Sequence, residues 1–421
     1  MLGQLEADKV IEKLRTGLPP KQGVALYSVG YGGLIDSIKE HHINKIESKY
    51  LFRGISGSWG AGKTHLFRLL VDLAFSSNCV VSNVELDKTS QALNKFETIV
   101  YAIIRNISTP PMDTSGSDID KSGFGLLLTN SLGYLTTGMQ NIPDHVTDEH
   151  FNKASSALLS DEKIDADFKK MVVHYWKTLV EPDINQGVLQ LTRDEIIQWF
   201  CGEGSIGFYK KKYLVMKMIK RENSKWMFQS LARFVRLSGY RGLVILFDEA
   251  ESSYSVMSKS ALKDAQNNLK FLIDNVEASP GMFLIYAATP DFYVDPKYGI
   301  KVYGALYQRI GTPEQKPPTA LQKVWNIDQV QIGLEDWQSS ARKIRDIYLA
   351  AYPDAEKSIL SVADTNKFVS ELFESHPKAA AVSFPRLMVT ALVVHFDNLY
   401  EGIQTTFDEL KDDVMTRLRE E

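Results

Sequence analysis

Apolar positions along the chain follow two different periods, and the order in which these periods alternate indicates the class of fold. Residues 66–74 carry apolar side chains three and four residues apart, which is the spacing of a helix with one buried face. Residues 49–57 before this helix and residues 79–87 after it have the apolar and β-branched content of short strands. Strand, loop, helix and strand in this order predict a mostly parallel sheet that is covered by helices.

Two later segments have the pattern of strands that are buried on both faces. Residues 242–252 (GLVILFDEAES) form a continuous apolar run that ends in acidic residues, and residues 281–292 (GMFLIYAATPDF) contain a second such run. Between them, residues 259–278 have the spacing of a helix that is long enough to connect parallel strands. We therefore expect an α/β fold with a parallel central sheet.

Helical spacing dominates two other parts of the chain. From about residue 125 to residue 236 the apolar positions are largely helical, which predicts a helical insertion before the sheet resumes. Helical patterns return after about residue 315, so this last region is expected to be all-α. An opening helix at about residues 6–16 is expected to end where Gly17 and Pro19 interrupt it.

The composition restricts the partners that the protein is expected to bind. Lysine and arginine number 48 against 52 aspartates and glutamates, so the net charge of −4 gives the whole chain no attraction for nucleic acid. Any contact with DNA must be local, and the basic run at residues 210–221 (KKKYLVMKMIKR) is the candidate, with a solvated surface as the alternative. Cys79 and Cys201 cannot form a disulfide framework, and no apolar run reaches the roughly 18–20 residues of a membrane span. These features predict a cytoplasmic protein with no membrane contact.

The clearest chemical signal is a glycine-rich run between a predicted strand and a predicted helix. Residues 57–64 (GSWGAGKT) match the pattern G-x-x-x-x-G-K-[ST], in which backbone N–H groups and the helix N-terminus converge on phosphate oxygens. The predicted cofactors are ATP and Mg²⁺, because Lys63 would reach the β- and γ-phosphates and the Thr64 hydroxyl would hold the metal. Trp59 is expected either to pack over the loop or to contact a neighbouring subunit. The predicted nucleotide-binding residues of this run are Gly57, Ser58, Trp59, Gly60, Ala61, Gly62, Lys63, Thr64 and His65.

Two acids at the end of a predicted strand complete a hydrolytic site. Asp248 stands at the carboxyl end of its strand, where an α/β sheet places groups that bind ligands. We expect Asp248 to hold Mg²⁺, directly or through water, and Glu249 to act as the general base that deprotonates the attacking water. The alternative is that these acids end the strand simply by reaching solvent. Glu251 is a further candidate, with a helix-capping or solvated role as its alternative.

Three more residues have a predicted role, and two of them also have a plain alternative. Thr289 ends a strand expected to lie between the two others, where it could sense the γ-phosphate or the lytic water; alternatively, Pro290 only initiates a turn. Arg309 could be an arginine finger for the nucleotide of a neighbouring subunit, or form a surface salt bridge. Arg386 follows Pro385 in the first turn of a predicted helix, from which it could contact bound nucleotide as part of a lid.

The order of these motifs resembles that of AAA+ ATPases, specifically the branch near the origin-recognition and STAND-type ATPases. Residues 29–38 (VGYGGLIDSI) are similar to the segment that such proteins fold over adenine, which implies that Val29 and Gly30 lie near the base. The motifs GSWGAGKTH, VSNVELD, DEAES, ATPDF and FPRLM resemble more narrowly the BrxC/BrxD-type ATPase subunits of BREX-type bacterial phage-exclusion systems. Origin-recognition relatives often have Asn at the sensor and Asn-Pro-Arg in the lid, where this chain has Thr289 and Phe-Pro-Arg.

The resemblance implies a fold, a domain order and a set of partners. The implied fold is the three-layer sandwich of P-loop NTPases, with a helical insertion and a C-terminal all-α lid. The implied partners are DNA, a helicase or other defence proteins, and further copies of the chain in a ring or filament. The predicted domains are the first part of the AAA+ core with the phosphate loop (1–110), a mostly helical insertion (111–236), the second part of the core (237–314) and a C-terminal helical lid (315–421).

Three functions make use of such a phosphate loop. The first is an ATP-hydrolysing motor or loader that acts on DNA with partner proteins in bacterial anti-phage defence. The second is a slow-turnover switch or scaffold that assembles a defence or signalling complex when ATP sets its conformation; the acidic net charge and the long helical insertion favour protein contacts. The third, a kinase of a small acceptor, is disfavoured because Asp248 and Glu249 suit the activation of water.

Overall fold

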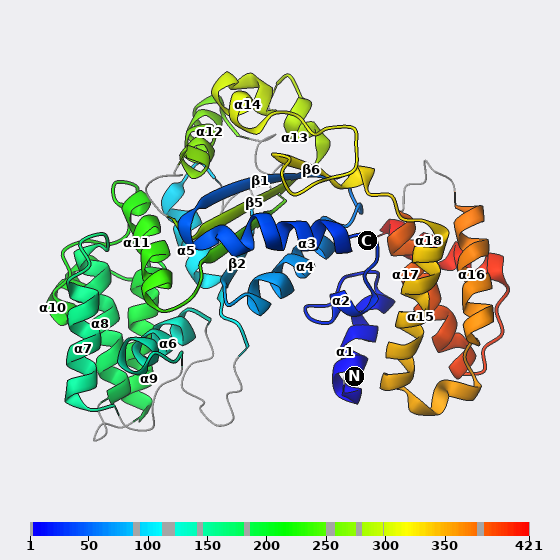
Figure 1. Cartoon of the computed structure of the whole chain (residues 1–421), viewed down its shortest axis with the longest axis horizontal. Coiled ribbons are helices and arrows are strands. Elements are labelled where there is room, and N and C mark those ends of the chain that lie inside the picture. The colour runs from blue at the N-terminus through cyan, green and yellow to red at the C-terminus, as the bar shows by residue number, and fades with distance from the viewer. Residues whose placement is uncertain are drawn as a thin grey trace.

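The protein has a mixed α/β structure built around one sheet (Figure 1). The computed structural model describes residues 3–86, 93–111, 123–140, 146–180, 186–249, 257–274, 280–297, 299–376 and 383–420. In this part of the chain the sheet has six strands in the order β3-β2-β4-β5-β1-β6, and all neighbours are parallel except β2 and β3. The strand bounds are Tyr50–Ser56 (β1), Val80–Glu85 (β2), Ile107–Ser108 (β3), Leu243–Asp248 (β4), Met282–Ala288 (β5) and Val324–Asn326 (β6). The mostly parallel sheet predicted from the sequence is therefore confirmed.

The central strands are buried on both faces, as their continuous apolar runs predict. The apolar residues of β4 are at most 1% exposed, and β5 is buried along its whole length. The register pairs Ser56 of β1 with Ala288 of β5, and Phe247 of β4 with Tyr286 of β5. The carboxyl ends of β1, β4 and β5 therefore meet at one edge of the sheet, with β5 in the middle. Such an edge is where open α/β sheets bind ligands.

Helices cover both faces of this sheet. The helices concerned are α3 (Gly32–His41), α4 (Lys63–Ser76), α5 (Phe96–Arg105) and α12 (Lys259–Asp274). On one face, α3 and α4 share an apolar cluster with Ile55, Val244 and Ile285, and Figure 1 shows both helices in front of the strands. On the opposite face, α5 and α12 share a second cluster with Val80 and Ile245. The alternation of side chains along each strand sends neighbouring residues into these two separate cores.

A helical lobe of α6 to α11 lies at one end of the sheet, between β3 and β4 in the sequence. Its centre is aromatic, since Phe124 and Phe168 both meet Phe200 edge to face, with 4.9 Å between ring centroids. The indole of Trp176 is fully buried and donates from Nε1 to the carbonyl of Leu128 at 2.8 Å. The helix bounds are Gly123–Thr137 (α6), Asp148–Leu159 (α7), Ala166–Val180 (α8), Gln186–Phe200 (α9), Ile206–Tyr213 (α10) and Ser224–Leu237 (α11).

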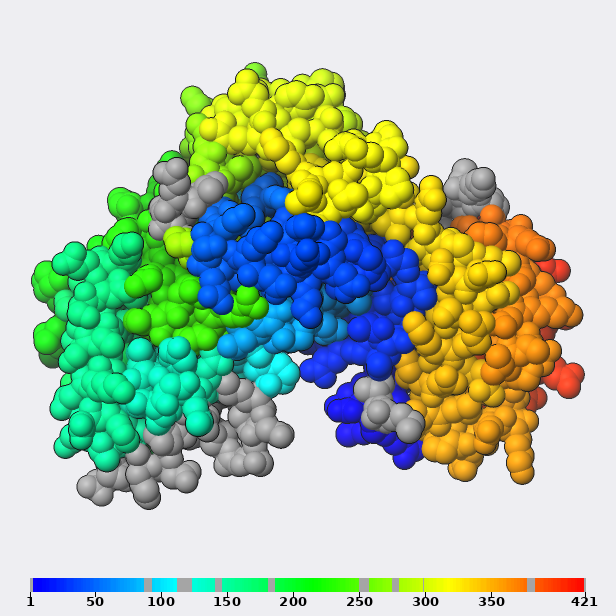
Figure 2. Space-filling model, in the orientation of Figure 1, coloured from blue at the N-terminus to red at the C-terminus, as the bar shows by residue number. Residues whose placement is uncertain are grey.

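A C-terminal bundle forms the other end of the molecule, and the first helix of the chain belongs to it. Arg15 on α1 donates from Nε and Nη2 to the carboxylate of Asp397 on α17, at 2.7 and 3.0 Å, and Tyr348 on α15 donates to the same carboxylate at 2.9 Å. Figure 2 shows the helical lobe and this bundle on opposite sides of the core. The bundle consists of α1 (Gln4–Arg15), α15 (Leu334–Ala351), α16 (Val362–Ser375), α17 (Phe384–Tyr400) and α18 (Phe407–Glu420).

The short strand β6 is a difference from the all-α region expected after residue 315. With three residues it is too short to show a period, and its pairing with β1 defines it instead.

Cys79 and Cys201 are buried and form no disulfide. Across the described ranges, no helix has both the length and the apolar content needed to cross a membrane. The remaining short helices are α2 (Val24–Tyr27), η1 (Ile43–Ser48), α13 (Pro290–Val294), η3 (Ile300–Val302), α14 (Gly304–Ile310), η4 (Ile327–Gln329) and η5 (Pro353–Lys357).

Candidate functional site

The glycine-rich run forms a tight loop between β1 and α4, which we call the phosphate loop (residues 57–62). Gly57 N donates to the carbonyl of Ala288 at 3.2 Å, which joins the start of the loop to the end of β5. Gly60 and Gly62 have φ values of 74° and 98°, in the left-handed region where a residue with a side chain is strained. The shape of the loop therefore requires glycine at these two positions.

The phosphate loop curls around the ammonium group of Lys63. Lys63 Nζ donates to the carbonyls of Gly57 and Ser58 at 2.8 and 3.1 Å. The centroid of the Trp59 ring lies 5.4 Å from the same Nζ, while the Trp59 side chain remains 70% exposed. Lys63 is also the first residue of α4, so its charge adds to the partial positive charge of the helix N-terminus. An anion is favoured at this point of the molecule.

The acids at the end of β4 reach the same region. Thr64 Oγ1 donates to Asp248 Oδ2 at 3.3 Å, and Glu249 N donates to Asp248 Oδ1 at 3.0 Å. Burial raises the pKa of Asp248, while its hydrogen bond from the Glu249 backbone and the charge of Lys63 act in the opposite direction. Glu249 has a φ of 52°, a left-handed conformation that is uncommon for a residue with a side chain. Glu251 lies outside the described residues.

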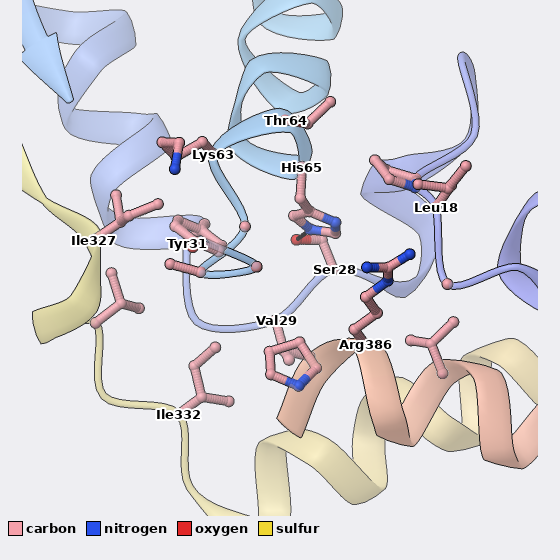
Figure 3. Close-up of a pocket in the computed structure, with 18 of the residues that line it drawn as sticks. Leu18, Ser28, Val29, Tyr31, Lys63, Thr64, His65, Ile327, Ile332 and Arg386 are labelled. Atoms are coloured by element: carbon pink, nitrogen blue, oxygen red, sulfur yellow. Dashed lines mark hydrogen bonds between the residues drawn. The ribbon is translucent and has the colours of Figure 1, made fainter. Parts of the chain in front are cut away.

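A cavity of about 610 Å³ opens beside the phosphate loop. Pockets that hold small-molecule ligands have volumes of roughly 300–1,000 Å³, so a nucleotide fits this space. Figure 3 shows Arg386 extending from α17 toward the side of the cavity on which Ser28 and His65 lie. Of the residues that the sequence predicts for the site, the cavity is lined by Val29, Trp59, Gly60, Ala61, Gly62, Lys63, Thr64, His65, Asp248, Glu249 and Arg386.

Aromatic residues form one wall of this cavity. The His65 ring centroid lies 5.6 Å from that of Tyr27 and 6.0 Å from that of Tyr31. Ser28 Oγ and His65 Nε2 share a hydrogen bond of 2.8 Å. Burial lowers the pKa of His65 to about 4, so the imidazole is neutral near pH 7. Ser340 on α15 donates to the carbonyl of Tyr27 at 2.7 Å, which attaches this wall to the C-terminal bundle.

Three predicted residues, Gly30, Gly57 and Ser58, do not line the cavity but contact residues that do. Gly57 and Ser58 form the base of the phosphate loop. Gly30 has a φ of 81°, and a Cβ built on it would lie 2.6 Å from the Ile332 side chain, so only glycine leaves room there. All three support residues that line the cavity.

Thr289 and Arg309 do not line the cavity in the described structure. Thr289 is 7% exposed and directly follows β5, between the ends of β1 and β4, and α13 begins at the next residue, Pro290. Arg309 lies on α14, where it pairs with Asp274 at the end of α12 and donates to the carbonyl of Ala305 at 2.8 Å. Arg309 therefore takes part in a surface ion pair and does not reach the cavity of its own chain in the described structure.

Half of the basic residues in the candidate DNA-binding run pair with acids of the same chain. Lys210 and Lys211 end α10 with exposed side chains, and Lys220 is also exposed. The other basic residues of the run form ion pairs within the chain. These pairs are Lys212 with Glu195, Lys217 with Asp165 and Arg221 with Asp264. The surface available to a nucleic acid is thus smaller than the sequence run indicates.

Several residues of the cavity were not predicted from the sequence. Asp328, Val330 and Ile332 follow β6 and line the cavity next to the phosphate loop and Gly30. The available signal was the short run VWNID at residues 324–328, in which apolar residues alternate with Asn326 and Asp328 at the polar end. Leu14 and Leu18 from the start of the chain also line the cavity, and nothing in their helical spacing indicates that position.

Comparison with known proteins identifies the family. The family described as BREX system ATP-binding protein BrxC/D matches residues 3–414. No curated protein matches the chain. The family match covers nearly the whole chain, including the phosphate loop, the acids at the end of β4 and the arginine of α17. The chain therefore belongs to the BrxC/D family of BREX system ATP-binding proteins.

Proposed function

We propose that the protein is an AAA+ type P-loop ATPase that hydrolyses ATP in the cytoplasm and acts as a DNA-associated motor or loader with partner proteins in bacterial anti-phage defence. The observation that carries this proposal is the convergence of Lys63, Thr64, Asp248 and Glu249 at one end of a cavity of nucleotide size. Lys63 and Thr64 begin α4, directly after the phosphate loop that follows β1, and Asp248 ends β4; β1 and β4 end at the same edge of the sheet, where such sheets bind ligands.

The strand order supports the comparison with AAA+ ATPases. Strand β5 separates the strand that leads into the phosphate loop from the strand that ends in Asp248. Thr289 therefore stands between the phosphate loop and the acids, as the sensor role requires. Helices on both faces of the sheet agree with a three-layer sandwich. The boundaries proposed for the domains remain 1–110, 111–236, 237–314 and 315–421.

ATP would lie in the cavity in one orientation. The phosphates would lie at the phosphate loop, where Lys63 and the N-terminus of α4 neutralise their charge. The base would lie farther along, between the wall of Tyr27, Tyr31 and His65 and the apolar side chain of Ile332. Gly30 contributes by letting Ile332 approach the chain closely.

The donor set at the phosphate end fits a magnesium ion. Magnesium prefers oxygen ligands, keeps several waters and takes one or two protein groups. Thr64 Oγ1 and Asp248 Oδ2 supply two such oxygens 3.3 Å apart. These two residues would hold the ion, which when bound polarises phosphate oxygens.

Glu249 would accept a proton from the attacking water. A general base must lie within hydrogen-bond reach of that water, and Glu249 lines the cavity beside Asp248. Arg386 would contact the nucleotide from α17. The position of the C-terminal bundle would therefore depend on whether the site holds a nucleotide. Arg309 would act on the nucleotide of a neighbouring copy in an oligomer.

A substitution of Glu249 tests hydrolysis separately from binding. Glu249→Gln should bind ATP with unchanged affinity and lose phosphate release by about 10²-fold or more, the usual weight of a general base. Lys63→Ala is the control that should lose binding as well. Phosphate release by Glu249→Gln at the wild-type rate would contradict the proposed role of the acid.

A slow-turnover switch or scaffold is the second candidate. The observation that favours it is the internal pairing of charges that a DNA motor would need, since Arg309 pairs with Asp274 and half of the basic residues in the run at 210–221 form ion pairs within the chain. A switch would keep its activity in the cell after Glu249→Gln, because ATP binding alone sets its conformation. A motor would lose that activity.

A further inference from the structure

The structure places the carboxylate of Asp328 against Ser58 of the phosphate loop. Ser58 N donates to both carboxylate oxygens of Asp328, at 3.1 Å each, and Ser58 Oγ donates to Asp328 Oδ2 at 3.0 Å. Given the nucleotide site of the proposed function, we propose that Asp328 is a positioning residue that holds the phosphate loop in its ATP-binding shape and links it to the C-terminal bundle.

Ser58 is held firmly in the loop because its N–H, hydroxyl and carbonyl all form hydrogen bonds. Its N–H and hydroxyl bond to Asp328, and its carbonyl accepts from Lys63 Nζ at 3.1 Å and from Ala61 N at 3.2 Å. The carbonyl bonds orient the lysine that would meet the phosphates. The bonds to Asp328 hold the same residue through its backbone N–H and its hydroxyl. A loop held in this way loses less conformational freedom when it binds an anion.

Asp328 lies in a segment that contacts both ends of the cavity, which we call the strap (residues 327–332). At one end, a Cβ on Gly57 would lie 2.5 Å from Ile327, so the strap presses directly on the start of the loop. At the other end, Ile332 packs against Gly30 on the base side. Two residues farther along, α15 begins at Leu334. The strap, which lies between β6 and α15, therefore links the phosphate loop to the C-terminal bundle.

The carboxylate has two opposing effects on nucleotide binding. Its hydrogen bonds order the loop, which favours binding, and charge-assisted bonds of this kind are the stronger class. Its negative charge on the wall of the cavity repels the phosphates, which disfavours binding. The proposal states that the ordering effect is the larger of the two. The substitution Asp328→Asn separates the ordering effect from the repulsion, because it removes the charge and keeps one acceptor oxygen.

The test measures ATP affinity by calorimetry, and KM and kcat for phosphate release, on the full chain. We expect Asp328→Ala to raise the Kd for ATP roughly tenfold, the weight of one hydrogen bond to a charged group. KM should rise in parallel while kcat stays within about twofold, because the groups that contact the reacting atoms are untouched. Asp328→Asn should fall between wild type and Asp328→Ala. Ser58→Ala should add little in the Asp328→Ala background, since the partner of its hydroxyl is already gone.

The outcomes separate this inference from the proposed function. If Asp328→Ala binds ATP as tightly as wild type, or more tightly, the carboxylate does not position the loop and the inference is overturned. The inference is also overturned if two results occur together: Asp328→Ala lowers the melting temperature without nucleotide, and Asp328→Asn loses as much ATP affinity as Asp328→Ala. The role of the carboxylate would then be structural. A wild-type chain that binds ATP only as weakly as Lys63→Ala would overturn the proposed function and this inference together.

Discussion

The Thr64 hydroxyl on α4 donates to Oδ2 of Asp248 on β4 at 3.3 Å, across 184 residues of sequence. This contact is the observation behind the proposed magnesium site. Thr64→Val should remove the gain in ATP affinity that Mg²⁺ produces, because valine has the same shape and no oxygen ligand. Calorimetry with Mg²⁺ and with EDTA measures that gain. Thr64→Ser keeps the hydroxyl and should retain it; an unchanged Mg²⁺ effect in Thr64→Val would contradict the site.

Arg309 offers a test of assembly. Arg309→Ala and Lys63→Ala should each lose ATP hydrolysis by about 10²-fold or more, one lacking the finger and the other lacking the nucleotide. If Arg309 acts on a neighbouring copy, mixing the two variants should restore part of the activity. At some interfaces the Lys63→Ala copy supplies an intact Arg309 to the nucleotide that the Arg309→Ala copy binds through its intact Lys63. Asp274→Ala is the matched control for the surface ion pair. A loss in Asp274→Ala equal to that in Arg309→Ala, with no recovery on mixing, would mean that the arginine only pairs within its own chain.

The exposed lysines at the end of α10 carry the proposed contact with DNA. Lys210→Glu combined with Lys211→Glu should weaken DNA binding roughly tenfold and lower the salt dependence of the binding constant by about two phosphate contacts. Lys212 is left in place because it pairs with Glu195 and its loss would disturb the lobe. Lys9→Glu combined with Lys13→Glu, at exposed positions on α1, is the control. Equal binding by both double variants, measured over a salt series, would assign the lysines of α10 to solvated surface.

His42 should make stability depend on pH. Burial lowers the pKa of His42 to about 4, with the charge of Arg53 acting in the same direction. Between its ordinary pKa of about 6.5 and this value the unfolded chain binds the proton and the folded chain does not, so the free energy of unfolding falls as the pH falls through that window. The slope from this residue approaches about 1.4 kcal/mol per pH unit. Denaturant unfolding of His42→Gln should show a flatter profile than wild type, and an equally steep profile would contradict the role of this residue.

The sequence was sufficient for the parts of the fold that have long, regular patterns. The apolar runs of β4 and β5 predict fully buried strands, and the leucines of α4 lie on its buried side, where their spacing puts them. The phosphate loop and the acids after β4 could be paired because both follow strands of a parallel sheet. The predicted roles of Thr289 and Arg309 remain predictions.

The parts that were not predicted depend on contacts between distant segments. Strand β6 has three residues and takes its identity from pairing with β1, so no period could mark it. Asp328 contacts Ser58 across 270 residues, and a lone acid after a short strand is too common to indicate that partner. The place of α1 in the C-terminal bundle depends on Arg15 and Asp397, which no spacing rule connects.

The position of α1 has a consequence for biosynthesis. Its apolar side, formed by Ala7, Val10, Ile11 and Leu14, is buried in a cluster that includes α15 and α17. A ribosome makes this helix more than three hundred residues before its partners. The growing chain must therefore carry an uncovered apolar helix through most of its synthesis, and a chain that stops before α15 lacks both helices that cover that surface. Such incomplete chains should associate with one another or with chaperones, so only the finished protein combines a covered first helix with a closed nucleotide cavity.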